Sequence, residues 1–169
     1  EEHGLAYPTL YDWNRDGKQD LLVGEFLTGQ SRIKVYLNEG SNRKPKFTGE
    51  WFYATDMNGD VISNYQWCCI GIHPQIVDMD GDGYLDIISG QYYPGEISWW
   101  RGTEKGFEPR RMIEQFGYQP GKEFTSFGGD PDWSPEAWAY WNYSSARVAD
   151  FNGDGLLDLF VGGTGGYRV

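Results

Sequence analysis

The sequence predicts an all-β protein assembled from repeated units of four antiparallel strands. An acidic motif of the form D-x-[DN]-x-D-G-x-x-D begins at Asp12, Asp78 and Asp150, so the starts lie 66 and then 72 residues apart. Short apolar or β-branched runs flank every copy, helical periodicity is scarce, and glycine (24 residues) and aromatic residues (17%) are abundant. A period of this length suits a unit of several strands, and together with strand-like flanks it indicates propeller blades.

Each acidic motif is expected to be a loop that joins the first two strands of a unit. The runs that enter the loops are "LAYPTLYDW", "HPQIVDMD" and "SARVADFN", and those that leave them are "DLLVGEF", "DIISGQYY" and "DLFVGG". Third and fourth strands are expected in "RIKVYLNEG" and "KFTGEWFYAT" around the turn "SNRKP", and in "GEISWWRG" and "FEPRRMIEQF" around the turn "TEKG". The third unit is expected to stop in "GGTGGYRV", after its second strand.

This division predicts one partial propeller domain over 1–169 that holds about two and a half blades. Repeat 1 covers about 5–69, repeat 2 about 70–143, and a half repeat about 144–169.

Length and charge narrow the class of protein. A chain of 169 residues with 39% hydrophobic content can build the core of one ordinary domain. The net charge of -11 argues against nucleic-acid binding, which needs a cationic surface, and favours bound cations or cationic partners. No apolar run is long enough to span a bilayer, and "EEHGLAYP" does not resemble a signal peptide. If the protein is secreted, this sequence is expected to be a mature or excised form.

The three loops predict metal sites. Positions 1, 3, 5 and 9 offer side-chain oxygens, position 7 offers its backbone carbonyl, and glycine at position 6 permits the positive φ that wraps the chain round a centre. The candidate ligands are Asp12, Asn14, Asp16, Lys18 and Asp20; Asp78, Asp80, Asp82, Tyr84 and Asp86; and Asp150, Asn152, Asp154, Leu156 and Asp158. Five protein oxygens suit Ca²⁺ better than Mg²⁺ or a metal that prefers nitrogen and sulfur. We therefore expect about three Ca²⁺ ions, one per loop.

Two other calcium-binding patterns fit the sequence less well. A helix-loop-helix calcium site shares the first six positions but requires glutamate at position 12, where this chain has Val23, Ser89 and Val161. The near-motif "DMNGDVIS" at Asp56 has valine where glycine is needed, so a hairpin or inter-blade turn is expected there.

The three loops, with their trailing "LLVG", "IISG" and "LFVGG", resemble the FG-GAP and VCBS-type repeats of integrin α-subunit-like β-propellers. The resemblance implies a calcium loop between the first two strands of each blade, within a propeller of six to eight blades. Because this chain holds fewer, either further blades lie in the same polypeptide or several copies of the chain close the ring. Weak calcium loops fill at the millimolar calcium outside cells, so an extracellular, secreted, cell-surface or periplasmic location is expected.

The connection over 116–143 contains nine aromatic and four acidic residues, which is unusual for a plain loop. Aromatic faces beside carboxylates suit sugar rings or a cationic ligand, although the same residues could cover a blade edge. The candidate ligand-binding residues are Trp133, Glu136, Trp138, Tyr140, Trp141 and Tyr143. A protein or glycan ligand is expected, and no nucleic acid.

No catalytic residue is predicted, because the sequence shows no nucleophile motif, phosphate loop or zinc spacing. His73 is expected to be packed or hydrogen-bonded rather than a base. Cys68 and Cys69 could be reduced thiols, a vicinal disulfide, or reactive or metal-binding thiols. Two functions remain open: a non-catalytic calcium-stabilised binding or adhesion module, and part of a carbohydrate-active enzyme similar to a polysaccharide lyase.

Overall fold

The computed structural model describes residues 6–26, 29–64, 71–91, 97–113, 145–163 and 166–168. Every regular element among them is a β-strand, and every pair of neighbouring strands is antiparallel, which confirms the all-β prediction. The described residues contain no helix of the length and apolarity that crossing a membrane requires.

Three main sheets follow one another along the chain. The first contains β1 (Ala6–Tyr11), β2 (Asp20–Glu25), β3 (Ser31–Tyr36) and β4 (Phe52–Tyr53), with the short β5 (Ser63–Asn64) paired to β3. The second contains β6 (Gln75–Val77), β7 (Asp86–Ser89), β8 (Ser98–Trp100) and β11 (Arg111–Met112). The third contains β12 (Ser145–Ala149), β13 (Asp158–Gly163) and β14 (Gly166–Arg168). A separate hairpin consists of β9 (Gly102–Thr103) and β10 (Gly106–Phe107).

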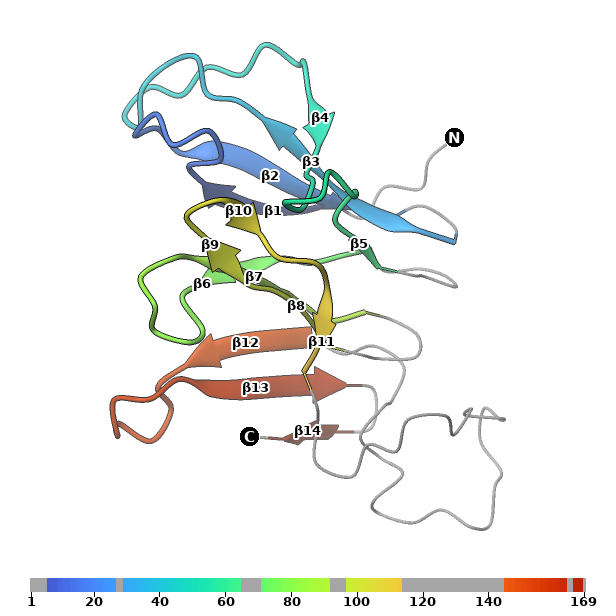
Figure 1. Cartoon of the computed structure of the whole chain (residues 1–169), viewed down its shortest axis with the longest axis vertical. Coiled ribbons are helices and arrows are strands. Elements are labelled where there is room, and N and C mark those ends of the chain that lie inside the picture. The colour runs from blue at the N-terminus through green and yellow to red at the C-terminus, as the bar shows by residue number, and fades with distance from the viewer. Residues whose placement is uncertain are drawn as a thin grey trace.

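The sheets stack face to face in chain order, and the three acidic loops project on the same side of the stack (Figure 1). Each acidic loop joins the first two strands of its sheet, as predicted. In each sheet the aspartate at position 9 of the motif begins the second strand and pairs with the last residue of the first strand. Asp20 lies opposite Tyr11, Asp86 opposite Val77, and Asp158 opposite Ala149.

One local expectation was wrong, and two short strand pairings were not predicted. The third unit does not stop after its second strand, because the chain turns back and β14 pairs with β13. The fourth strand of the second sheet lies within "FEPRRMIEQF" as predicted, as β11, while the turn in "TEKG" also closes a short hairpin, β9–β10, that was not predicted. The first sheet also gains β5, which pairs with the end of β3 that β4 leaves unpaired.

Alternating burial along β2 and β3 shows how the first two sheets meet. Leu22, Ile33 and Val35 are fully buried, while the residues between them on the same strands are only partly covered. They form one core with Ile87 and Trp100 of the second sheet. Each fully buried aliphatic side chain contributes about 1.5–3 kcal/mol to stability.

The second sheet is covered on both faces, and all four residues of β7 are buried. Ile87 belongs to the core shared with the first sheet, whereas Ile88 belongs to a second core with Ala146 and Val148 of the third sheet. The adjacent isoleucines of β7 therefore point to opposite faces of the second sheet, each packed against a different neighbouring sheet.

Two polar or backbone contacts also fix how the sheets stack. The Gln75 side chain donates to the Val148 carbonyl at 3.1 Å and accepts from the Val148 N–H at 2.9 Å, so it serves backbone groups of β12, an edge strand of the third sheet. Gly24 allows the chain entering the second sheet to pass against β2, since a Cβ there would lie 1.8 Å from the Ile72 carbonyl oxygen.

Two of the features singled out in the sequence, His73 and the turn at Asp56, lie among the described residues. His73 is buried, its ring lies 5.4 Å from the ring of Tyr7, and its Nδ1 is 3.2 Å from the Gly71 carbonyl oxygen, which agrees with a packed, hydrogen-bonded role. The Asp56 turn is a hairpin closed by the bridge between Thr55 and Val61. Cys68, Cys69 and the connection over 116–143 lie outside the described residues.

We expect Gly24→Ala to lower the free energy of unfolding by about 3 kcal/mol, because the new methyl group forces apart backbone segments of two sheets. Gly162→Ala is the matched control, because Gly162 occupies the same motif position and a Cβ placed there has no atom of the described residues within 4 Å. This variant should change stability by less than about 1 kcal/mol. Chemical denaturation of both variants measures the difference, and equal effects would contradict the described sheet junction.

We expect Gln75→Ala to cost about 1–3 kcal/mol, because the N–H and C=O of Val148 both lose their partner. Gln30→Ala removes one exposed hydrogen bond to Ser63 and should stay within about 0.5 kcal/mol of the wild type. Thermal melts of the two variants compare these effects; a Gln75 variant as stable as the Gln30 control would contradict the role of Gln75 between sheets.

Candidate metal centre

The three acidic loops share one hydrogen-bond scheme. The carboxylate at position 1 accepts the backbone N–H groups of positions 5 and 6, and the side chain at position 3 also accepts the N–H of position 5. The donor–acceptor distances at position 1 are 3.0 and 2.8 Å for Asp12, 3.1 and 2.9 Å for Asp78, and 3.1 and 3.0 Å for Asp150. The carboxylate at position 5 in turn accepts the N–H of position 7, from Lys18, Tyr84 and Leu156. Each loop is thus folded around its own oxygen atoms.

Glycine at position 6 adopts the backbone conformation that the sequence predicts. The φ angles are 84° at Gly17, 91° at Gly83 and 87° at Gly155, a region that residues with a Cβ rarely occupy. The chain therefore turns back at this point and brings position 9 towards position 1.

The aspartate at position 9 connects the loop to the sheet. Asp20 and Asp86 have no exposed surface. One oxygen of each accepts the N–H of position 2 at 2.9 Å, from Trp13 or Met79. The other oxygen accepts an N–H beyond the third strand, from Asn38 at 2.8 Å or Gly102 at 2.6 Å. In the third loop, Asp158 accepts the N–H of Phe151 at 2.9 Å.

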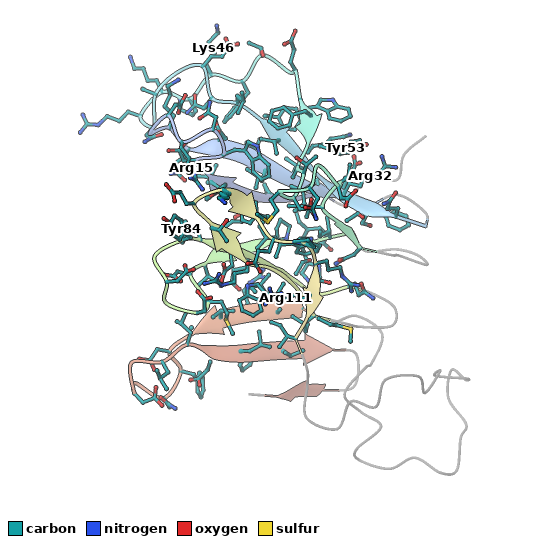
Figure 2. The ribbon with its side chains drawn as sticks, in the orientation of Figure 1. Arg15, Arg32, Lys46, Tyr53, Tyr84 and Arg111 are labelled. Carbon is teal, nitrogen blue, oxygen red and sulfur yellow. The ribbon has the colours of Figure 1, made fainter. Side chains whose placement is uncertain are left out.

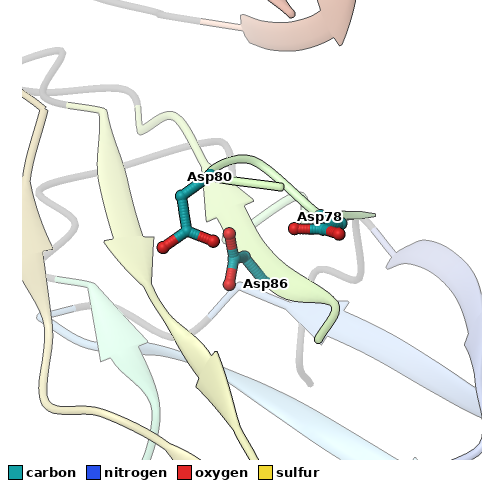
Figure 3. Close-up of side chains that lie close together, drawn as sticks. All are labelled: Asp78, Asp80 and Asp86. Atoms are coloured by element: carbon teal, nitrogen blue, oxygen red, sulfur yellow. The ribbon is translucent and has the colours of Figure 1, made fainter. Parts of the chain in front are cut away.

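The second loop brings three carboxylates together. One carboxylate oxygen from each of Asp78, Asp80 and Asp86 lies within 4.8 Å of the other two, and Figure 3 shows the three side chains together. Among the residues described, no other three histidine, cysteine or acidic side chains meet that distance. The first and third loops carry Asn14 and Asn152 where the second has Asp80, so each has one carboxylate fewer.

The fourth carboxylate of the second loop, Asp82, lies outside this group of three. Its Oδ2 accepts from Nη2 of Arg101, while Nε of Arg101 donates to Asp80 Oδ2. In the first loop, Asp16 Oδ2 contacts the Lys18 ammonium at 2.9 Å. In the third, Asp154 Oδ2 accepts from the Asn152 amide at 3.0 Å.

These surroundings move the pKa values of the carboxylates in opposite directions. The hydrogen bond from Arg101 holds the pKa of Asp80 below its usual range, and the hydrogen bond from Lys18 does the same for Asp16. Burial raises the pKa of Asp86, although the N–H groups of Gly102 and Met79 oppose that shift. A buried carboxylate of this kind gains from a cation beside it.

The donor set of the loops fits a hard divalent cation. All candidate side-chain donors are carboxylate or amide oxygens, as Ca²⁺ prefers. Tyr84 is 39% exposed, and the candidate donor that it offers is its backbone carbonyl. Asp56 forms a similar turn by accepting the N–H groups of Asn58 and Asp60, but no convergence of carboxylates accompanies it within the described residues.

Sequence reasoning missed the contacts that surround the loops. Arg15 donates to the backbone carbonyls of Thr103 and Glu104, at 2.7 and 2.6 Å, and so joins the first loop to the β9–β10 hairpin of the next unit. Figure 2 shows Arg15 on the side of the stack where the loops project. Its φ of 59° is unusual for a residue with a side chain, and Gly81 and Gly153 occupy the equivalent position in the other loops. The arginine at motif position 4, where the other two loops have glycine, was the feature of the sequence that could have indicated a role for Arg15.

Comparison with known proteins agrees with this architecture. The family model described as FG-GAP-like repeat matches residues 78–161. Integrin alpha-4 of Xenopus laevis is 27% identical over 163 residues, which covers 89% of this chain and 13% of that protein. No solved structure matches.

The matched segment runs from Asp78, the first residue of the second acidic loop, to Val161 in β13 of the third sheet, and therefore includes two of the three loops. The integrin likeness extends over most of the chain. Residues 78–161 therefore form an FG-GAP-like repeat segment, and the antiparallel sheets of the chain agree with blades of an integrin-like β-propeller.

Proposed function

We propose that this chain is a segment of a calcium-stabilised extracellular β-propeller that acts as a binding or adhesion module. The observation that carries the proposal is the hydrogen-bond scheme that recurs in three loops around side-chain oxygens. The likeness to an integrin α subunit supports an extracellular or cell-surface location and a role in adhesion.

One Ca²⁺ would be held in each loop by the side chains at positions 1, 3, 5 and 9 and the carbonyl at position 7. The bound ion would offset the repulsion among clustered carboxylates and the cost of burying Asp86. The chain's own N–H groups orient the oxygens, and the position 9 aspartate links each filled loop to strands of its blade. The proposed role of calcium is therefore structural.

The terminal faces of the stack support neighbouring blades, supplied by the same polypeptide or by other copies of the chain. Leu10 is 55% exposed, whereas its counterpart Ile76 packs against the first core and Val148 against the second. At the other end Phe151 is 69% exposed, whereas its counterparts Trp13 and Met79 pack against the neighbouring blade. Covering these apolar faces is what an adjacent blade would do.

A protein or glycan ligand remains part of the proposal. Loops carry recognition in scaffolds of this kind more often than strands do. The connection over 116–143 supplies the aromatic and acidic residues that such ligands need.

We expect chelation of calcium with EDTA to lower the melting temperature. The decrease should be about 5–10 °C for each site whose dissociation constant is one hundredth of the free Ca²⁺ concentration before chelation. Added Ca²⁺ should restore it, and Mg²⁺ at the same concentration should restore less. Asp78→Asn should reduce the calcium-dependent shift, while Asp56→Asn, in the near-motif, should leave it unchanged. A melting curve that EDTA does not alter would reject the calcium sites.

We expect a ligand screen in millimolar Ca²⁺, with arrayed glycans and extracellular proteins, to yield binding that Trp138→Ala or Trp141→Ala weakens at least tenfold. Trp51→Ala is the control, since Trp51 is an exposed aromatic residue on the first blade. Retained binding in both connection variants would exclude the connection over 116–143 as the ligand site.

A further inference from the structure

Arg101 is the residue that most distinguishes the second acidic loop from the other two. It directly follows β8 and lies between Asp80 and Asp82, donating from Nε to the first and from Nη2 to the second. Its remaining nitrogen, Nη1, lies 3.7 Å from Glu108 Oε1. One guanidinium group therefore contacts two carboxylates that belong to the proposed calcium loop.

Arg101 lies beside the acidic loop that carries the most negative charge. The second loop has four aspartates, at positions 1, 3, 5 and 9, whereas the first and third have asparagine at position 3. The added carboxylate is that of Asp80, which Arg101 contacts. In the first loop the Lys18 ammonium contacts one loop carboxylate, Asp16 at position 5, and the backbone carbonyl of Asn38.

A fixed cation in this position has two opposite effects. Without calcium it neutralises part of the repulsion among four carboxylates and holds Asp80 and Asp82 in place. With calcium it lies near a second positive charge and weakens the attraction of the loop for the ion. Because a guanidinium group does not lose its proton in proteins, both effects persist at every physiological pH.

We propose that Arg101 is a built-in counter-cation of the second loop, which stabilises the loop without metal and sets its calcium affinity below that of the same loop without the arginine. This inference rests on the proposed binding of calcium. It makes the second blade, which has a neighbouring sheet on each face, the blade whose loop depends least on the ion.

The test compares Arg101→Met with the wild type by calorimetric titration with Ca²⁺ and by thermal melts in EDTA and in millimolar Ca²⁺. Methionine keeps much of the side-chain length and removes the charge. A unit charge about 6 Å from a divalent ion, in a dielectric close to that of water, changes affinity about tenfold. We therefore expect one site to bind Ca²⁺ about tenfold more tightly, the melting temperature in EDTA to fall, and the calcium-dependent rise in melting temperature to increase.

Two variants are controls. Arg111→Met removes a guanidinium group that contacts Glu108 at 2.5 Å in the same blade and has no contact with the loop aspartates, so calcium affinity should not change. Arg101→Lys retains the charge and should keep the affinity within about threefold of the wild type. If Arg101→Met does not fold in EDTA, the double variant Asp80→Asn/Arg101→Met, which gives the second loop the composition of the others, should restore folding.

Unchanged or weaker calcium binding by Arg101→Met, in a wild-type background that binds calcium, would overturn this inference and leave the proposed function standing. If Arg101→Met lowered the melting temperature equally in EDTA and in Ca²⁺, Arg101 would have only a structural role, and the inference would likewise be overturned. A wild-type chain that shows neither calorimetric heat nor a calcium-dependent melt would overturn both proposals.

Discussion

The buried aspartate that ends each of the first two acidic loops connects the parts of its blade. Asp20 and Asp86 are withdrawn from water, which is costly for a carboxylate unless it is hydrogen-bonded. Each accepts one N–H from its own loop and one from beyond the third strand. Because these partners are backbone groups, the path of the loop, the start of the second strand and the end of the third are set relative to one another. Position 9 is therefore as much a structural position as a candidate ligand.

The loops and the strands that flank them could be predicted because their information is local. Spacing, the glycine at position 6 and the trailing apolar run all lie within about fifteen residues of one another, and the structure forms each loop as expected. Contacts between blades could not be predicted in this way. Arg15 and Gln75 reach backbone groups 88 and 73 residues away, which nothing in their neighbouring sequence indicates. The role of Arg101 likewise depends on the return of β8 beside the loop.

Equivalent residues of the three repeats differ in burial according to their place in the stack. Val148 and Ile76 contribute to cores between blades, while Leu10 occupies the same position at an open face. Gly24 lies against the chain that enters the next blade, while no atom of the described residues lies within 4 Å of a Cβ placed on the corresponding Gly162. Repetition of sequence thus specifies the blade, and the neighbours of each blade specify how much of its surface is covered.

The β9–β10 hairpin belongs to the second blade but contacts the loops of two blades. Arg15 donates to its Thr103 and Glu104 carbonyls, and the ring of Trp13 stacks on Phe107 with centroids 5.5 Å apart. On the other side, the hairpin's Gly102 N–H is held by Asp86. Opening the first blade away from the second would break the contacts of one loop and disturb the anchor of the other. We therefore expect the first two blades to unfold together, as a cooperative unit larger than one sequence repeat.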